Sequence, residues 1–331
     1  MTKTWLIYAL GGGWGHINRA LSLGRIAVNQ RRIEIITNSP YAQYISKEGC
    51  LLHQISDSDS FAATCLKVRE IFNTNTTKYD CLIIDTFPRG LGGELAEILP
   101  QIHNIPKILI HRDINPRYVE VKNLRSFVTE NFQAVIIPGE GKDLPLGDLP
   151  GVIHTAPWLI RHPEELPDRK IVRSQILKVD DSRKIILVCA AGQISELSLF
   201  TQLTLQLHKA FPECAVRILS PYCPSEDLRD FWLFHHPGIE CFAAADIVVG
   251  SAGYNTVYEC ASVGVPLVAL PLPRLYDRQQ KRASKVYQVR NIPDALFTVK
   301  QILNTVTDSQ LIPNYINGAI AAVHHIANFE L

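Results

Sequence analysis

The sequence predicts an α/β fold of two doubly wound domains, each built on a parallel sheet. Short apolar runs rich in β-branched residues recur along the chain, and they are continuous rather than alternating. Such runs are typical of strands that helices cover on both faces. Helical patterns separate the runs, and this alternation favours doubly wound sheets. The length of 331 residues, of which 47% are hydrophobic, is enough for two domains with a core each.

Nine apolar runs are predicted as strands, in two series. The first series comprises residues 4–10, 33–37, 81–85, 107–111 and 134–138, and the second comprises 184–190, 215–219, 246–250 and 266–270. Helical patterns cover residues 17–30, 91–99, 194–211 and 255–264, and a last pattern at 313–329 is predicted as a terminal helix.

Residues 139–182 separate the two series and are rich in proline and polar side chains. This composition is typical of a connection between domains. We therefore expect an N-terminal Rossmann-like domain over residues 1–155 and a C-terminal Rossmann-like domain over residues 156–331, facing a cleft.

Charge and composition exclude several classes of protein. The formal net charge is +1 without a basic half, so we expect no nucleic-acid partner. The eight cysteines form no C-x-x-C pair, which argues against structural zinc and favours free thiols in a reducing, cytoplasmic setting. Asp57-Ser58-Asp59 has metal-motif spacing but lies in a polar loop, so neither a metal nor another cofactor is expected. No run reaches the roughly 18 apolar residues of a spanning helix, and a peripheral membrane contact stays open.

A glycine-rich turn follows the first predicted strand, with the sequence Gly11-Gly12-Gly13-Trp14-Gly15-His16. Glycines at such a turn allow positive φ and close approach of a ligand, and the helix start behind them favours anionic groups. The turn lacks the G-x-G-x-x-G dinucleotide spacing. The alternative is a tight turn whose glycines serve packing alone.

His16 is a candidate general base because the positive end of the helix dipole favours a neutral imidazole. Capping or packing at the helix start is the equally weighted alternative. Two carboxylates are candidates to orient His16, namely Asp85 at the end of the strand at 81–85 and Asp113 after the strand at 107–111. For both of them, turn or helix capping is the alternative.

The second half carries a second candidate site after the strand at 246–250. We expect a helix to begin near Asn255 and Thr256, where free N–H groups can hold a diphosphate without a metal. The carboxylate of Glu259 can accept both hydroxyls of a ribose. Its alternative is the capping box Thr256-x-x-Glu259, and the two roles can coexist.

A polar loop follows the strand at 266–270, at the strand end where doubly wound sheets bind ligands. Its Asp277, Gln279 and Gln280 offer directional hydrogen bonds to sugar hydroxyls. The alternative is an Asp N-cap with a polar first helical turn.

The segment GSAGYNTVYECASVGVPLVALPLPRLYDRQQKRA resembles the donor-site segment of glycosyltransferase family 28, including its peptidoglycan N-acetylglucosaminyltransferases. GGGWGHINRALSLG, KILIHRDINP and APWLIR resemble further family segments in the same order. The first half otherwise matches only in pattern, so the lipid I reaction itself is not inferred. Two departures are that the phosphate loop reads Ala190-Ala191-Gly192-Gln193-Ile194, without the family serine, and that Ser251 replaces a family arginine.

The resemblance implies a GT-B fold and an inverting sugar transfer that requires no metal. It places Glu259 on the donor ribose, the two glutamines near the donor sugar, Arg161 near the diphosphate and His16 near the acceptor hydroxyl. The complete predicted set is catalytic His16, Asp85 and Asp113, and donor-binding Gly13, Gly15, Arg161, Gln193, Ser251, Gly253, Asn255, Thr256, Glu259, Asp277, Gln279 and Gln280.

The expected function is transfer of a sugar from a nucleotide donor, a UDP-sugar, to an acceptor hydroxyl. The acceptor stays open among lipid, glycan, protein and small molecule, and lipid-linked acceptors are included. One alternative is a UDP-sugar 2-epimerase of the same fold, which would yield the 2-epimer without an acceptor. The other is a non-catalytic nucleotide-binding subunit, for which the altered loop at 190–194 is the reason.

Overall fold

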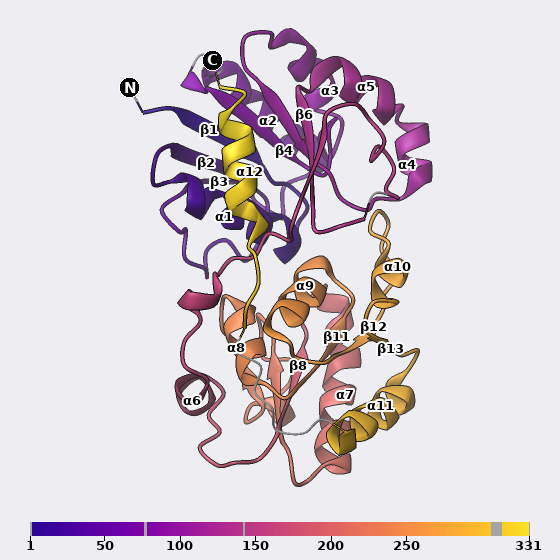
Figure 1. Cartoon of the computed structure of the whole chain (residues 1–331). Coiled ribbons are helices and arrows are strands. Elements are labelled where there is room, and N and C mark those ends of the chain that lie inside the picture. The colour runs from indigo at the N-terminus through magenta and orange to yellow at the C-terminus, as the bar shows by residue number, and fades with distance from the viewer. Residues whose placement is uncertain (1, 76–77, 142, 306–312, 331) are drawn as a thin grey trace. The chain divides into compact units, whose positions relative to one another are not determined.

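A computed structural model of the chain describes residues 2–75, 78–141, 143–305 and 313–330. The chain divides into two compact units (Figure 1). The first comprises Met1–Ile160, Leu275–Asp277 and Ile316–Leu331, and the second comprises Arg161–Arg274 and Arg278–Tyr315. The main division at Ile160 is near the expected boundary after residue 155, whereas the C-terminal segment groups with the first unit.

The first unit contains a seven-stranded sheet in the order β3-β2-β1-β4-β5-β6-β7, with every neighbouring pair parallel. Its strands are β1 (Thr4–Tyr8), β2 (Arg32–Thr37), β3 (Leu51–Gln54), β4 (Cys81–Asp85), β5 (Lys107–Ile110), β6 (Ala134–Pro138) and β7 (Val152–Thr155). Its helices are α1 (Trp14–Ala27), α2 (Phe61–Asn75), α3 (Leu95–Ile98), α4 (Pro116–Val121), α5 (Leu124–Asn131) and α12 (Gly318–Ala327).

The second unit contains a six-stranded parallel sheet in the order β10-β9-β8-β11-β12-β13. Its strands are β8 (Ile185–Cys189), β9 (Ala215–Leu219), β10 (Trp232–Leu233), β11 (Ile247–Ser251), β12 (Leu267–Leu270) and β13 (Tyr287–Gln288). Its helices are α6 (Arg169–Ile171), α7 (Leu197–Ala210), α8 (Gly238–Ala244), α9 (Tyr254–Val263), α10 (Gln279–Ala283) and α11 (Ile292–Thr305).

All nine predicted strands are present, and the two parallel sheets confirm the predicted α/β class. The four additional strands, β3, β7, β10 and β13, are the edge strands of the two sheets. Edge strands are short and partly exposed, so they lack the continuous apolar run on which the prediction depends. β7 lies inside residues 139–182, which the composition predicts to be a connection throughout.

Most predicted helices are present, with shifted ends. The patterns at 17–30, 194–211, 255–264 and 313–329 correspond to α1, α7, α9 and α12. The pattern at 91–99 gives only the four-residue α3. Gly93 precedes it with a φ of +92°, outside the helical region, so the helix cannot begin earlier.

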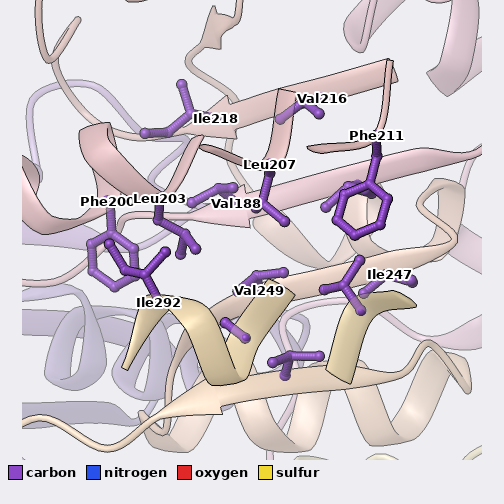
Figure 2. Packing of buried hydrophobic residues seen from close by; sticks show 14 of the residues in the cluster. Val188, Phe200, Leu203, Leu207, Phe211, Val216, Ile218, Ile247, Val249 and Ile292 are labelled. Atoms are coloured by element: carbon purple, nitrogen blue, oxygen red, sulfur yellow. The ribbon is translucent and has the colours of Figure 1, made fainter. Parts of the chain in front are cut away.

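Figure 2 shows how the second unit fills one face of its sheet. Phe200, Leu203 and Leu207 lie at helical spacing along α7 and are buried against Val188 of β8 and Val249 of β11. The strand residues recur at every second position, because alternate side chains point to the same face. This packing fixes α7 and the strand ends from which the loops of the candidate site emerge.

The order of strands gives each unit one switch point, where the chain reverses direction across the sheet. It lies between β1 and β4 in the first unit and between β8 and β11 in the second. Loops at the carboxyl ends of such strands diverge and leave room for ligands. The predicted site residues Gly13, His16 and Asp85 follow or end β1 and β4, whereas Gln193, Ser251 and Gly253 follow or end β8 and β11.

The terminal helix α12 belongs to the first unit, where it packs on α1 and β7 (Figure 1). Asn317 caps it by accepting the Ala319 N–H at 3.1 Å, and its amide group donates to the Leu159 carbonyl at 2.6 Å. A Cβ on Gly318 would lie 1.9 Å from the Ala156 carbonyl oxygen. The close approach of two backbones therefore requires glycine at this position.

The eight cysteines are all free, and six of them are buried. Among the helices in the described ranges, none is long and apolar enough to cross a membrane.

Candidate functional site

The glycine-rich turn after β1 is held by one side chain from the neighbouring strand. Asn38, directly after β2, accepts the N–H groups of Gly11 and Gly12 at 2.8 and 2.9 Å. Gly12 has a φ of +68°, which favours glycine. α1 then begins at Trp14, whose ring stacks on Tyr41 with centroids 4.4 Å apart. These contacts fix the direction in which α1 leaves the sheet.

His16, in the first turn of α1, contacts Asp85 at the end of β4. Its Nδ1 lies 2.6 Å from Asp85 Oδ2, and the two side chains are 18% and 3% exposed. Because β4 pairs with β1, the strand end and the helix start meet at the switch point. The structure thus brings His16 together with one of its two predicted partners.

Arg19 holds the same carboxylate from the next turn of α1. It donates from Nε to Asp85 Oδ1 at 2.8 Å and from Nη2 to Oδ2 at 2.7 Å. His16 and Arg19 are three residues apart and therefore share one face of the helix. Burial alone would raise the pKa of the Asp85 carboxyl, but Arg19 and His16 hold it far below its usual range. Asp85 is consequently ionised at neutral pH.

The imidazole of His16 is confined on both sides. A Cβ on Gly11 would lie 2.0 Å from its Cδ2 and 2.3 Å from its Nε2, and the ring of Phe87 stacks on it at 5.5 Å. With Nδ1 donating to the carboxylate, Nε2 carries the lone pair and can accept a proton. Neither Arg19 nor the packing role of Gly11 was predicted from the sequence.

In the first unit, the other predicted site residues make contacts that differ from those of His16 and Asp85. Asp113 is buried, and its backbone N–H donates to Glu140 Oε2 at 2.5 Å. Asp277 groups with the first unit, and its carboxylate lies 3.6 Å from Arg112 Nη2. A Cβ on Gly13 or Gly15 would meet nothing within 4 Å, so packing does not require glycine at either position.

In the second unit, α9 begins at Tyr254, with Gly253 as an N-cap that makes no side-chain hydrogen bond. Thr256 is therefore the third helical residue rather than the cap, and Glu259 lies in the second turn. The alternative that Thr256 and Glu259 form a capping box is wrong, because the helix starts earlier than the sequence pattern predicts. Ser251 ends β11, and Asn255 is the second residue of α9, so both lie beside this helix start.

Glu259 is 5% exposed. Burial raises the pKa of its carboxyl to about 7, and no neighbouring charge or hydrogen bond offsets that effect. An unpaired buried carboxyl is costly, and such groups are concentrated at functional sites. Its chemistry is that of an acceptor for hydroxyl or amide donors of a ligand.

The two predicted glutamines of α10 have different environments in the second unit. Gln279 is buried, and its Oε1 accepts the Leu272 N–H at 3.0 Å, which holds the loop after β12. Gln280 is exposed and lines a cavity of about 610 Å³ together with residues of α7 and the segment before α11. The N-cap of α10 is Arg278, so the alternative that Asp277 caps this helix is wrong.

Arg161 and Gln193 also make contacts within the second unit. Arg161 donates from Nε to Glu240 Oε1 at 2.9 Å, and His235 contacts the other oxygen of Glu240 at 2.7 Å. Gln193 is exposed and forms a capping box with Glu196 at the entrance to α7. Within the described residues, no group of three His, Cys, Asp or Glu side chains is arranged to hold a metal.

Comparison with protein families gives a match to the second half of the chain. Residues 189–326 match the model of the glycosyltransferase family 28 C-terminal domain. The match contains the predicted donor residues from Gln193 to Gln280. No curated protein matches the chain closely in sequence.

Solved structures resemble the whole chain. The glycotransferase of kitacinnamycin has a TM-score of 0.61 and 12% identity, with 100% of each chain covered. The Streptomyces sp. SF2575 glycosyltransferase SsfS6, complexed with thymidine diphosphate, has a TM-score of 0.60 and 14% identity over 98% of this chain and 96% of that one. A UDP-glucosyltransferase from Polygonum tinctorium has a TM-score of 0.58 and 10% identity over 99% and 98%. The fold is therefore that of GT-B glycosyltransferases, as the sequence predicted.

Proposed function

We propose that the chain is an inverting glycosyltransferase that moves a sugar from a nucleoside diphosphate donor to an acceptor hydroxyl. The observation that carries this proposal is the 2.6 Å contact between His16 Nδ1 and the buried Asp85 carboxylate. A histidine with one nitrogen held by an ionised carboxylate presents the other as a base. The GT-B fold and the family 28 match of residues 189–326 support the class of donor.

The chemical step is a direct displacement. His16 Nε2 takes the proton of the acceptor hydroxyl, and the hydroxyl oxygen forms a bond to the anomeric carbon. The bond from that carbon to the diphosphate oxygen breaks on the opposite side, so the configuration inverts. Asp85 stabilises the imidazolium that results, and Arg19 keeps the carboxylate in place and ionised.

The second unit holds the donor in this proposal. The ribose hydroxyls donate to Glu259, whose unpaired carboxyl is available for them. The diphosphate takes the N–H groups at the start of α9, which supply positive potential without a metal. Gln280 of α10 is assigned to the sugar, and so is Asp277, which groups with the first unit. Gln279 positions the loop after β12 through its hydrogen bond to the Leu272 N–H.

The nucleotide is proposed to be UDP, with TDP as its main competitor. Family 28 resemblance supports uracil, and one structural neighbour is a UDP-glucosyltransferase, whereas another is complexed with thymidine diphosphate. Thermal melting with UDP, TDP, GDP and ADP tests this directly. UDP at 100 times its Kd is expected to add about 2.7 kcal/mol of stability, and a shift with GDP alone would contradict the proposal.

The test of the activity is an assay of the products. The protein is incubated with UDP-sugars, with and without a mixture of lipid, glycan and small-molecule acceptors, and the products are resolved by mass spectrometry and NMR. The proposal predicts an acceptor-dependent release of UDP. Formation of the 2-epimer without an acceptor would instead identify the epimerase alternative.

A further inference from the structure

Two loops of the second unit are joined by an ion pair that the proposed mechanism does not use. Arg274, after β12, donates from Nη2 to Glu196 Oε2 at 3.0 Å and from Nη1 to Glu196 Oε1. The two side chains are 17% and 11% exposed. Glu196 Oε2 also accepts the N–H of Gln193 at 3.0 Å. One carboxylate thus holds both a guanidinium and a backbone amide.

The position of this carboxylate is unusual for a surface ion pair. A Cβ on Gly192 would lie 2.0 Å from Glu196 Oε2 and 3.4 Å from Arg274 Nη2, so the pair lies directly over the glycine. The loop follows β8 at the switch point of the sheet and leads into the 14-residue α7. A carboxylate therefore occupies the strand end where a doubly wound sheet binds its ligand.

We propose that Glu196 is an internal competitor of the donor diphosphate, and that Arg274 is the guanidinium that the diphosphate takes over when the donor binds. This inference rests on the proposed function, because it takes the ligand to be a nucleoside diphosphate sugar. Guanidinium groups bind carboxylates and phosphates with the same fork of N–H donors. A diphosphate carries more negative charge than one carboxylate, so it can displace Glu196 from both partners.

Arg274 has the unused donors that such an exchange needs. Two of its N–H groups bind Glu196, and Nη1 also donates to the Pro273 carbonyl at 3.0 Å. Nε–H and the second Nη2–H have no acceptor among the residues that the structure describes. A phosphate oxygen can therefore contact the guanidinium before Glu196 releases it. The loop at 190–194 itself contributes neither a hydroxyl nor a charged side chain, so Arg274 supplies the positive charge there.

A purely structural role for the pair predicts different behaviour. Glu196 and Gln193 form a capping box, and Arg274 would then only fasten the loop after β12. Glu196→Gln keeps a side chain that can cap but removes the charge that competes with phosphate. Arg274→Met keeps most of the apolar stem but removes the guanidinium. The two variants therefore distinguish competition between Glu196 and the diphosphate from a purely structural role of the ion pair.

The experiment compares UDP, TDP and uridine by calorimetric titration and competition NMR on the parent and the two variants. Glu196→Gln is expected to bind UDP several-fold more tightly, and Arg274→Met roughly tenfold to a hundredfold more weakly, with uridine unchanged in both. Glu196→Asp keeps the charge but shortens the side chain, and it is expected to bind UDP between the parent and Glu196→Gln. Arg229→Met is the control, because Arg229 pairs with Glu226 at an exposed site of the same unit.

The possible results test the role of Glu196, the role of Arg274 and the proposed function separately. If Glu196→Gln binds UDP no more tightly than the parent, Glu196 does not compete with the diphosphate. If Arg274→Met binds UDP like the parent, Arg274 does not bind the diphosphate. Equal losses for UDP and uridine indicate that the pair only fastens the loops. Melting curves on the same preparations show whether each variant is folded. A parent protein that binds no nucleotide at all contradicts the proposed function instead.

Discussion

Asp85 connects the fold of the first unit to its candidate chemistry. It ends the central strand β4, so backbone pairing with β1 and β5 fixes its position. Two side chains from one face of α1 converge on its carboxylate, and the buried guanidinium of Arg19 needs this anion as its partner. Asp85 therefore has a structural role toward Arg19 and a proposed catalytic role toward His16.

Removing the imidazole tests the proposed base. His16→Ala is expected to lower the rate of transfer by about 10²- to 10⁴-fold, the usual contribution of general base catalysis. Donor affinity should not change, because no proposed donor contact is lost. Rates and UDP affinity are measured together, and His325→Ala, an exposed histidine of α12, serves as the control. A variant that transfers sugar at the parental rate would remove His16 from the mechanism.

The carboxyl of Glu259 predicts how nucleotide affinity depends on pH. Its pKa is raised to about 7 by burial, and the ribose hydroxyls need the ionised form. UDP affinity is expected to be constant well above pH 7 and to fall as the carboxyl is protonated below it, until it reaches the affinity of a protein without this charge. Glu259→Gln should lose this dependence and bind UDP roughly ten- to a hundredfold more weakly. The phosphate's own titration is present in both proteins, so a pH profile that is identical in the two would contradict the assignment.

The same shift predicts a change in stability. The folded pKa lies above the ordinary value of about 4.3, so the folded state loses stability as pH rises through 7. Glu259→Gln removes this ionisation. The variant's free energy of unfolding relative to the parent should therefore be higher at pH 8 than at pH 5, by up to about 3 kcal/mol. Melting temperatures at the two pH values provide the measurement. If the melting temperatures of the two proteins differ by the same amount at pH 5 and at pH 8, ionisation of Glu259 does not change the stability of the folded state.

At the scale of elements, the turn between β1 and α1 determines where His16 lies. Gly11→Ala would place a methyl group on the imidazole, because a Cβ at this position would lie 2.0 Å from His16 Cδ2. It is expected to displace His16 and to lower transfer as strongly as His16→Ala, with donor affinity retained. Gly238→Ala, at the start of α8, is the control, since its Cβ would meet only ordinary contacts of 3.4 Å or more. Equal transfer rates in the two alanine variants would contradict this role of Gly11.

The elements that sequence patterns predicted are those with a local signal. Central strands are buried on both faces, so their apolar runs are continuous, as in 81–85 and 185–189. Edge strands such as β13, whose residues are exposed, have no such run. The start of α9 was misplaced because Gly253 caps it without a side chain, and the sequence offered Thr256 as a more familiar cap.

Contacts between distant residues were harder to predict than elements. The sequence offered both Asp85 and Asp113 as partners of His16, because the first ends a predicted strand and the second follows one. Only the pairing of β4 with β1 brings Asp85 to 2.6 Å from His16. Arg19 and Arg274 had no motif to mark them, although the spacing of Arg19 from His16 on one helix was a usable signal.

At the scale of the whole molecule, the chain returns to its first unit after completing the second. Residues from Ile316 onward lie in the first unit, and Asn317 binds Leu159 on both sides of its amide group. No local pattern indicates which unit a terminal helix joins, so the expected boundary assigned it to the second. The last helix thus contributes to the stability of the unit that carries His16.

This arrangement predicts a specific weakness at Gly318. Gly318→Ala would place a Cβ 1.9 Å from the Ala156 carbonyl oxygen, which α12 can accommodate only by moving away. Overpacking of this kind costs about 1–3 kcal/mol. Calorimetric melting should show an earlier transition, with the stabilisation by UDP unchanged. Ile320→Ala, at an exposed position of the same helix, is the control, and equal melting of the two variants would contradict the prediction.

In the proposed function, the chain transfers a sugar, with the base in its first unit and the donor site in its second. The most direct measurement is the stereochemistry and yield of the product from a UDP-sugar and an acceptor mixture in EDTA, for the parent and His16→Ala. We expect a glycoside with inverted anomeric configuration from the parent, and a His16→Ala protein that binds donor but makes almost no product. A parent that binds no nucleoside diphosphate sugar, or a glycoside that retains the donor configuration, would contradict it.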